Sequence, residues 1–161
     1  MKQSLLETAG GEISFTIRYA HESDLYGVAS LLDCLGYSHN AAELDSHFRT
    51  VLNHPEMEVF VAVSEDQEAV GLLTLRHSPI LRLNGYQINI EELVVHPGWR
   101  GYGIGGELLA FARRYALQKG AVRIEVHTSR SRESYRRQFY QKNGFVPAKS
   151  TLFRIDLRRT R

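Results

Sequence analysis

The stretch from Ile88 to Tyr115 constrains the fold of this chain more than any other. It joins a strand that ends in a His-Pro turn, a glycine-rich loop and an amphipathic helix that begins at once. Four glycines lie within the six residues Gly101–Gly106, so the backbone can turn tightly and no Cβ covers its N–H groups. The N-terminus of the helix adds further N–H donors and the positive end of the helix dipole. The stretch therefore predicts a site for phosphate, with Arg100 as its charged neighbour.

Two other phosphate-binding folds, the dinucleotide-binding fold and the P-loop fold, also use glycine-rich loops, but the rest of this chain does not fit either of them. Gly101, Gly103 and Gly106 satisfy the G-x-G-x-x-G pattern of a dinucleotide-binding fold. That pattern belongs to the first βαβ unit of a doubly wound sheet, and the chain after Gly106 is too short for the remaining strands and crossovers. A P-loop is excluded because no Gly-Lys-Ser or Gly-Lys-Thr follows the glycines.

The segment Arg100-x-x-Gly103-x-Gly105, preceded by a strand that ends at Pro97 and followed by a helix, resembles the acetyl-coenzyme A motif of the GCN5-related N-acetyltransferase (GNAT) family. Phe139–Phe145 resembles a second segment of that family, at the right separation. The resemblance extends roughly from Phe15 to Leu157. It implies a single α/β (α+β) domain with a mixed, largely antiparallel central sheet and helices on both faces. It also implies an acyltransferase that uses acetyl-CoA as cosubstrate.

The apolar periodicity predicts the elements of this domain. Residues 1–14 are predicted to be a loose segment and 15–161 to be the acetyltransferase domain. The predicted helices are 25–35, 41–52, a long helix from 104 to a C-cap at Gly120, and 133–143. The predicted strands are 15–19, 58–63, 69–75, 86–95, 122–126, 145–146 and 152–157. The strands between 58 and 95 are expected to form an antiparallel meander, and the last two to complete the sheet.

Composition narrows the cellular setting and the partners. A chain of 161 residues with 43% hydrophobic residues suits one globular core. No apolar run approaches the length of a membrane span and no secretory signal is visible, so a cytoplasmic protein is expected. The single cysteine, Cys34, cannot form an internal disulfide. The seven histidines lack the spacing of a metal site, so no metal is expected.

The positive charge is concentrated at the end of the chain. Residues 127–161 hold 10 Lys and Arg against 2 Asp and Glu, whereas residues 1–126 hold 10 against 16. A solvated surface accounts for this excess, and so does a role in meeting coenzyme phosphates or an acidic acceptor. Nucleic acid is not predicted, because no helix-turn-helix, zinc spacing or aromatic platform is present. The aromatic content and the basic last strand leave a homodimer open.

The resemblance implies how the coenzyme is held. The backbone of Leu93, Val94 and Val95 would pair with the pantetheine arm, and an N–H near Val94 or Val95 would stabilise the oxyanion. The pyrophosphate would lie on a loop whose members are Arg100, Gly101, Tyr102, Gly103, Ile104, Gly105 and Gly106. The chain departs from the family where many members carry Asn-x-x-Ala, since charged residues occupy those positions here. Arg132 or Arg136 is the candidate replacement for the asparagine contact.

Three residues are candidates for proton transfer. A carboxylate is needed to take a proton from the acceptor amine, and Glu91 and Glu92 are the candidates. Adjacent strand residues point to opposite faces, so one of them is expected to reach the acceptor cleft, and Glu91 is favoured because its position resembles the acidic base proposed in several family members. Ion pairing with an arginine would be a purely structural role for either. Tyr140 resembles the tyrosine that lies close to the coenzyme sulfur and can protonate the departing thiolate, with packing as its alternative role.

The acceptor is expected to be a primary amine of a small molecule, because so short a chain shows no added recognition module. The family places the helical pair 25–35 and 41–52 beside the acceptor, which makes Tyr37, His39 and His47 candidate substrate contacts. Two alternatives remain open. One is acetylation of a protein N-terminus or lysine, and the other is a non-catalytic coenzyme A-binding regulatory module.

Overall fold

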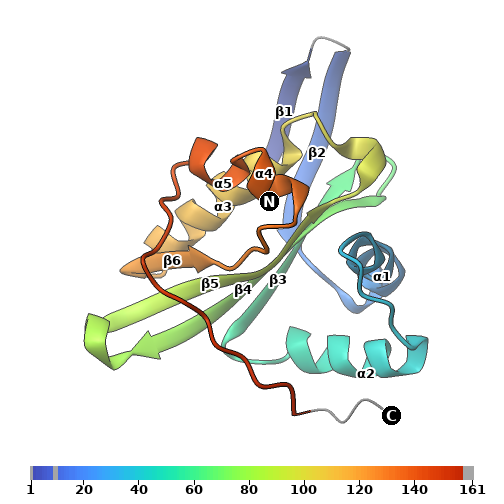
Figure 1. Cartoon of the computed structure of the whole chain (residues 1–161). Coiled ribbons are helices and arrows are strands. Elements are labelled where there is room, and N and C mark those ends of the chain that lie inside the picture. Colours follow the sequence, from blue (N-terminus) through green and yellow to red (C-terminus); the bar gives the residue numbers. More distant parts are fainter. Residues whose placement is uncertain (1, 9–10, 158–161) are drawn as a thin grey trace. The chain divides into compact units, whose positions relative to one another are not determined.

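A computed structural model describes residues 2–8 and 11–157 (Figure 1). The chain divides into two compact units, Met1–His127 and Thr128–Arg161. The first unit contains the sheet and the three longer helices. The second contains two short helices and the extended C-terminal segment.

The first unit is built on a sheet whose strands follow one another in chain order, β1-β2-β3-β4-β5-β6. Every neighbouring pair is antiparallel except β5 and β6, which are parallel. The mixed, largely antiparallel sheet that the sequence predicts is therefore confirmed. The strand bounds are β1 Lys2–Thr8, β2 Gly11–Tyr19, β3 Met57–Ser64, β4 Ala69–Ile80, β5 Gly85–Val95 and β6 Arg123–Val126.

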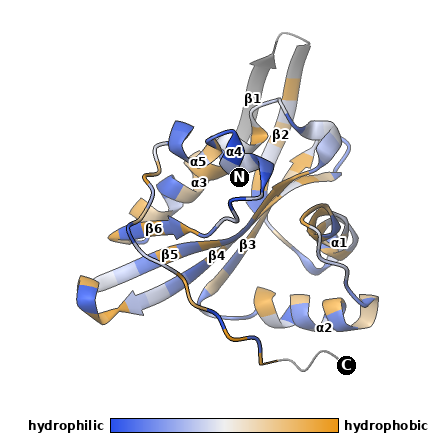
Figure 2. Cartoon of the chain, viewed as in Figure 1, coloured by the Kyte–Doolittle hydropathy of each residue, from blue (hydrophilic) through white to orange (hydrophobic). Residues whose placement is uncertain are grey.

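Helices cover both faces of this sheet, because the large apolar side chains of β3 and β4 point alternately to one face and to the other. Val59 and Val61 pack with α1 (Leu25–Cys34) and α2 (Ala41–Leu52). Phe60 instead contacts Phe111 and Tyr115 of α3 (Ile104–Gln118), with ring centroids 4.8 and 5.3 Å apart. The apolar residues gather in the central strands, as Figure 2 shows.

Two glycines let the helices approach the sheet closely. A Cβ on Gly27 of α1 would lie 2.6 Å from the Cβ of Ala69, at the start of β4. On the other face, a Cβ on Gly71 of β4 would lie 3.1 Å from Leu108 Cδ1 of α3. Both distances are shorter than ordinary van der Waals contact, so the packing of α1 and α3 on β4 depends on the missing side chains.

The sheet opens between β5 and β6. Their parallel pairing covers only Gln87–Ile90 of β5 and Arg123–Val126 of β6. Beyond Ile90, β5 continues to Val95 while still paired with β4, but it has no further β6 partner. The last residues of β5 therefore present a backbone edge on their β6 side.

The second unit differs from the helix and strands predicted for it. Residues 133–143 form two helices, α4 (Glu133–Arg136) and α5 (Phe139–Lys142), separated at Gln138, whose φ is +54°. A left-handed backbone cannot continue an α-helix, so the prediction of one helix is wrong at this residue. The predicted strands 145–146 and 152–157 are also wrong, because these residues have no ladder partner. The side chains of Phe153, Ile155 and Leu157 are largely exposed.

The N-terminal segment also differs from its prediction. The sequence predicts a loose segment over residues 1–14, whereas Lys2–Thr8 and Gly11–Tyr19 pair as antiparallel strands. β1 is defined by its backbone hydrogen bonds to β2. The pattern of apolar residues in the sequence is a weak guide to a strand of this kind. Residues 9 and 10 of the predicted loose segment lie outside the described residues, as does Met1.

Candidate active site

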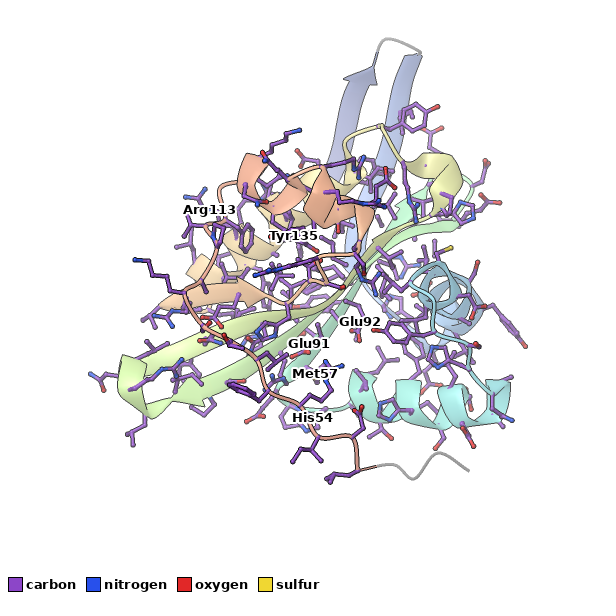
Figure 3. The ribbon with its side chains drawn as sticks, in the orientation of Figure 1. His54, Met57, Glu91, Glu92, Arg113 and Tyr135 are labelled. Carbon is purple, nitrogen blue, oxygen red and sulfur yellow. The ribbon has the colours of Figure 1, made fainter. Side chains whose placement is uncertain are left out.

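Glu91 and Glu92 lie at a β-bulge in β5. Thr74 of β4 pairs with Glu92, but the next β4 residue, Leu75, pairs with Ile90, so Glu91 is the extra residue. A bulge of this kind interrupts the alternation of side chains between faces. Both carboxylates therefore line one cavity on the α1 and α2 face, and Figure 3 shows them side by side below α1. The prediction that they point to opposite faces is wrong for this reason.

The Glu92 carboxylate is largely buried and bonded to Thr74. The Thr74 hydroxyl donates to Glu92 Oε2, and it accepts a hydrogen bond from the Glu92 backbone N–H at 2.8 Å. Burial raises the pKa of Glu92 to about 7, and the neighbouring Glu91 carboxylate adds to this rise. A carboxylate with a pKa near neutrality can take up a proton and release it again near pH 7.

Glu91 lies in a more exposed setting and forms an ion pair. Arg76 Nε, from β4, donates to Glu91 Oε1 at 2.7 Å, and Arg76 Nη1 donates to Ser78 Oγ at 2.8 Å. The side chain of Glu91 is 35% exposed. Glu91 therefore forms the ion pair with an arginine that the sequence analysis gave as the structural role of a strand glutamate.

The cavity has a volume of about 340 Å³ and lies between the sheet and the helices α1 and α2. Most of its lining is apolar, and it includes Val28 and Leu32 of α1, Phe48 and Val51 of α2, and Met57 and Leu72 of the sheet. Of the three predicted substrate contacts, His47 lies in the lining. Tyr37 and His39 are exposed residues before α2 and are not part of it.

The glycine-rich loop leads into α3 as the sequence predicts. Gly101 and Gly103 have φ values of +89° and +82°, a region that L-residues adopt only with strain. Gly103 is the N-cap of α3, and the first helical bond runs from Glu107 N to Gly103 O at 3.1 Å. The N–H groups of Ile104, Gly105 and Gly106 precede that bond, so they are the open donors of a helix N-terminus. This arrangement suits a phosphate group.

The end of β5 presents donors toward the side of β6. His96 N donates to Val70 O of β4 at 2.9 Å, so by alternation Val94 also directs its backbone polar groups toward β4. Leu93 and Val95 direct theirs to the open side. Arg100 Nε reaches back to Val95 O at 3.0 Å and joins the loop to this strand end. Of the two predicted oxyanion donors, Val95 N–H has the suitable direction and Val94 N–H does not.

Tyr140 is held within the second unit by aromatic neighbours. Its ring lies 5.2 Å from that of Phe139 and 6.0 Å from that of Phe145. Burial raises the pKa of the Tyr140 phenol, while Arg132 and the Thr128 side chain act in the opposite direction. The phenol thus keeps its proton at neutral pH. Arg132 and Arg136 lie at the two ends of the α4 turn, and Arg136 is exposed.

Thr74 and Arg76 are site residues that the sequence reasoning missed. They lie on β4, more than a dozen residues before the two glutamates, and only the cross-strand register brings them together. The sequence predicted that β4 pairs with β5. Polar residues in the otherwise apolar β4 could therefore have indicated the partners of the two glutamates.

Among the described residues, no group of three or more His, Cys, Asp or Glu side chains is arranged to hold a metal ion. None of the helices described here has the length and apolar character to span a membrane.

Comparison with known proteins agrees with this geometry. The profile of the acetyltransferase (GNAT) family matches residues 25–145. An aminoalkylphosphonate N-acetyltransferase from Salmonella typhimurium is 32% identical over 110 residues, which cover 68% of this chain and 63% of that enzyme. The chain therefore matches less than two thirds of the length of that relative.

Solved structures share the fold. An acetyltransferase from Trypanosoma brucei superposes with a TM-score of 0.73 at 26% identity, over 89% of this chain and 99% of that chain. A transcriptional regulator from Bacillus halodurans superposes with a TM-score of 0.79 at 26% identity, over 88% of this chain and 99% of that chain. The fold class expected from the sequence, a single α/β domain with a mixed, largely antiparallel sheet, is confirmed.

Proposed function

The chain belongs to the acetyltransferase (GNAT) family, and we propose that it transfers an acetyl group from acetyl-CoA to a primary amine of a small molecule in a ternary complex. The name of the Salmonella relative supports a small amine as acceptor. So does the cavity, whose volume of about 340 Å³ falls at the lower end of the range of small-molecule sites, roughly 300–1,000 Å³.

The observation that carries this proposal is the buried Glu92 carboxylate beside the open end of β5. An alkylamine with a pKa near 10.4 is neutral to only about one part in a thousand at pH 7, which costs about 4–5 kcal/mol. A base in the acceptor cavity removes that obstacle. Glu92 suits the task better than Glu91, because its pKa of about 7 lies near the working pH and Glu91 is engaged by Arg76.

The proposed reaction balances without a metal or redox partner. Acetyl-CoA supplies an activated acetyl thioester. The ammonium group gives one proton to the Glu92 carboxylate, and the neutral amine nitrogen then forms a bond to the acetyl carbon. The carbon–sulfur bond of this intermediate breaks, and the thiolate takes the proton of the Tyr140 phenol. The nitrogen loses its second proton to water as the amide forms. Glu92 then releases its proton to water and the Tyr140 phenolate takes one up, so the net products are the amide, coenzyme A and one proton.

The open donors at the loop and at β5 fit the coenzyme. The first-turn N–H groups of α3 suit its pyrophosphate, and the backbone of Leu93 and Val95 suits its extended amide-bearing arm. Val95 N–H is the candidate donor to the thioester oxygen. Arg100, tied to Val95 O, fixes the spacing between these two sets of donors.

The experiment that tests the proposal follows thiol release from acetyl-CoA with a panel of small primary amines, and measures coenzyme binding separately by calorimetry. Turnover with at least one amine is expected, and it should fall about 100- to 10,000-fold in Glu92→Gln, the usual range for a lost general base. The matched variant is Glu91→Gln on the adjacent residue. Coenzyme binding without turnover on any amine would contradict the proposal.

A further inference from the structure

The apolar lining of the cavity comes from the helices and from the sheet, where Met57 of β3 is in register with Arg76 of β4. Leu32 of α1, Phe48 and Val51 of α2, and Met57 and Leu72 of the sheet line this part. Phe48 and Leu72 are buried, while Leu32, Val51 and Met57 are half-buried and accessible from the cavity. A ligand group placed here would exchange water for aliphatic and aromatic contacts only.

The polar groups of the sheet lining lie together on β4 and β5. The Thr74–Glu92 and Arg76–Glu91 pairs hold these four side chains to one another. The remaining polar lining residue is His47, an exposed residue of α2. Both carboxylates thus lie on β5, and the apolar end of the cavity is the part lined by α1, α2 and β3. A complementary ligand has a cationic or amine head and an uncharged apolar body.

An anionic acceptor fits this lining poorly. Among the described residues that line the cavity, Arg76 is the one with a permanent positive charge. The guanidinium of Arg76 is already bonded to Glu91 Oε1 and to Ser78 Oγ. A phosphonate or phosphate at this place would have to displace Glu91 and would meet the field of two carboxylates. A polyhydroxylated amine would leave its hydroxyl groups without partners at the apolar end.

From this segregation we propose that the acceptor is a primary amine with a compact, uncharged, apolar body, and that Met57 and Val51 select for that body. The proposal rests on the proposed function, because the amine head lies at Glu92. It differs in chemistry from the aminoalkylphosphonate named for the Salmonella relative. The apolar end takes the body, and the Arg76–Glu91 pair closes the polar end to anions.

The test compares amines in two assays. Binding is measured by calorimetry with coenzyme A present, which has no acetyl group to transfer, and turnover is measured as thiol release from acetyl-CoA. The panel is ethylamine to hexylamine, cyclohexylmethylamine, 2-aminoethylphosphonate and glucosamine. Affinity and kcat/KM should rise roughly fourfold for each methylene added within the cavity, as burial of a methylene predicts. The phosphonate and the aminosugar should bind at least tenfold more weakly than cyclohexylmethylamine.

Variants at the wall test the assigned contact. Met57→Gln keeps the length of the side chain and makes it polar, and Met57→Leu is its apolar control. Because Met57 is half-buried, both variants should fold, which thermal unfolding checks. Met57→Gln should weaken binding of cyclohexylmethylamine about tenfold and of ethylamine less than twofold, whereas Met57→Leu should change neither by more than threefold. Val51→Thr, nearly equal in shape, should act in the same direction as Met57→Gln.

The outcomes separate the inference from the proposed function. Turnover of the phosphonate or the aminosugar in preference to the apolar amines would overturn the inference and leave the acetyltransferase proposal standing. Binding that follows the apolar series without turnover of any amine would support the inference and contradict the proposed reaction. Equal losses with ethylamine and cyclohexylmethylamine in Met57→Gln would remove Met57 from selection of the body.

Discussion

The Thr74 hydroxyl bonds twice to Glu92, accepting a hydrogen bond from its backbone N–H and donating one to its carboxylate. One hydroxyl thus fixes both ends of the glutamate across the β4–β5 pair. The bond to the carboxylate favours its ionised form, in opposition to the burial that raises its pKa. Thr74 is therefore expected to determine where on the pH scale Glu92 acts.

Thr74→Val should move the acidic limb of the pH profile of kcat/KM to higher pH. A hydrogen bond to a charged group contributes about 1.5–3 kcal/mol, so its loss should raise the pKa by about one to two units. At pH 7 the rate should then fall about 5- to 50-fold and recover at higher pH. Thr74→Ser retains the hydroxyl and should restore the wild-type profile. An unshifted profile in Thr74→Val would assign the residue a packing role only.

Glu91→Gln should shift the same limb to lower pH. The Glu91 carboxylate raises the pKa of Glu92 by like-charge repulsion, so removing that charge lowers it. The change also frees Arg76, whose positive charge then acts on Glu92 in the same direction. The measurement is kcat/KM between pH 5.5 and 9 for Glu91→Gln beside Glu92→Gln. If Glu91→Gln loses activity at every pH and Glu92→Gln does not, the assignment of the base is reversed.

Glu92 should also make the fold less stable as the pH rises from about 4.5 to about 7. Its pKa is raised from 4.5 to about 7, so between these values the folded chain holds a proton that the unfolded chain releases. A shift of that size corresponds to about 3 kcal/mol, fully lost above the folded-state pKa. Urea unfolding at pH 4 and pH 8 should show this difference in wild type relative to Glu92→Gln. Glu65→Gln, in an exposed turn, is the control that should leave it unchanged.

Tyr140→Phe should lower kcat about 100- to 10,000-fold and leave coenzyme binding unchanged, because only the departing thiolate requires the proton. Tyr135→Phe, a partly exposed tyrosine of the same unit, is the matched control and should keep full activity. Stopped-flow thiol release and calorimetry measure the two properties separately. A fall of less than threefold in Tyr140→Phe would remove the phenol from the mechanism.

Gly103→Ala should weaken coenzyme binding because it strains the N-cap of α3. A non-glycine residue in the left-handed region costs about 1–2 kcal/mol, which converts to roughly tenfold in affinity if the loop relaxes away from its binding geometry. Gly120→Ala supplies the control, since Gly120 has φ +68° beyond the other end of the same helix. Both variants should lose similar stability, and only Gly103→Ala should lose affinity for coenzyme A.

Local signals were sufficient for the elements that carry the coenzyme loop and the helical pair. The apolar stripe and its flanking residues predicted α2 as Ala41–Leu52, and the glycine pattern predicted the turn before Ile104. Asn84, in a left-handed conformation before Gly85, forms the turn that the Asn-Gly pair indicated. In each case the determining interactions lie within a few residues of one another.

The features that failed depend on partners remote in sequence. The bulge at Glu91 arises from the register between β4 and β5, and no pattern within β5 alone distinguishes it from a regular strand. The break at Gln138 is a single unfavourable backbone conformation inside a sequence with helical periodicity. The alternation of Leu152–Leu157 predicts a strand, but a strand also needs a neighbouring edge. The cavity depends on α1, α2 and the sheet together, and the sequence predicted only that the helical pair lies beside the acceptor.

The extra residue in β5 makes the site sensitive to the number of residues in the strand as well as to their identity. If one residue were deleted between Ile90 and Leu93, the alternation would become regular, and a single carboxylate would face the α1 and α2 side whichever glutamate remained. The site would then lose the second carboxylate beside the base and, with it, the ion pair between Glu91 and Arg76. Two sequences of this kind that align without a gap everywhere else can therefore differ in acid–base chemistry through one insertion or deletion in this strand.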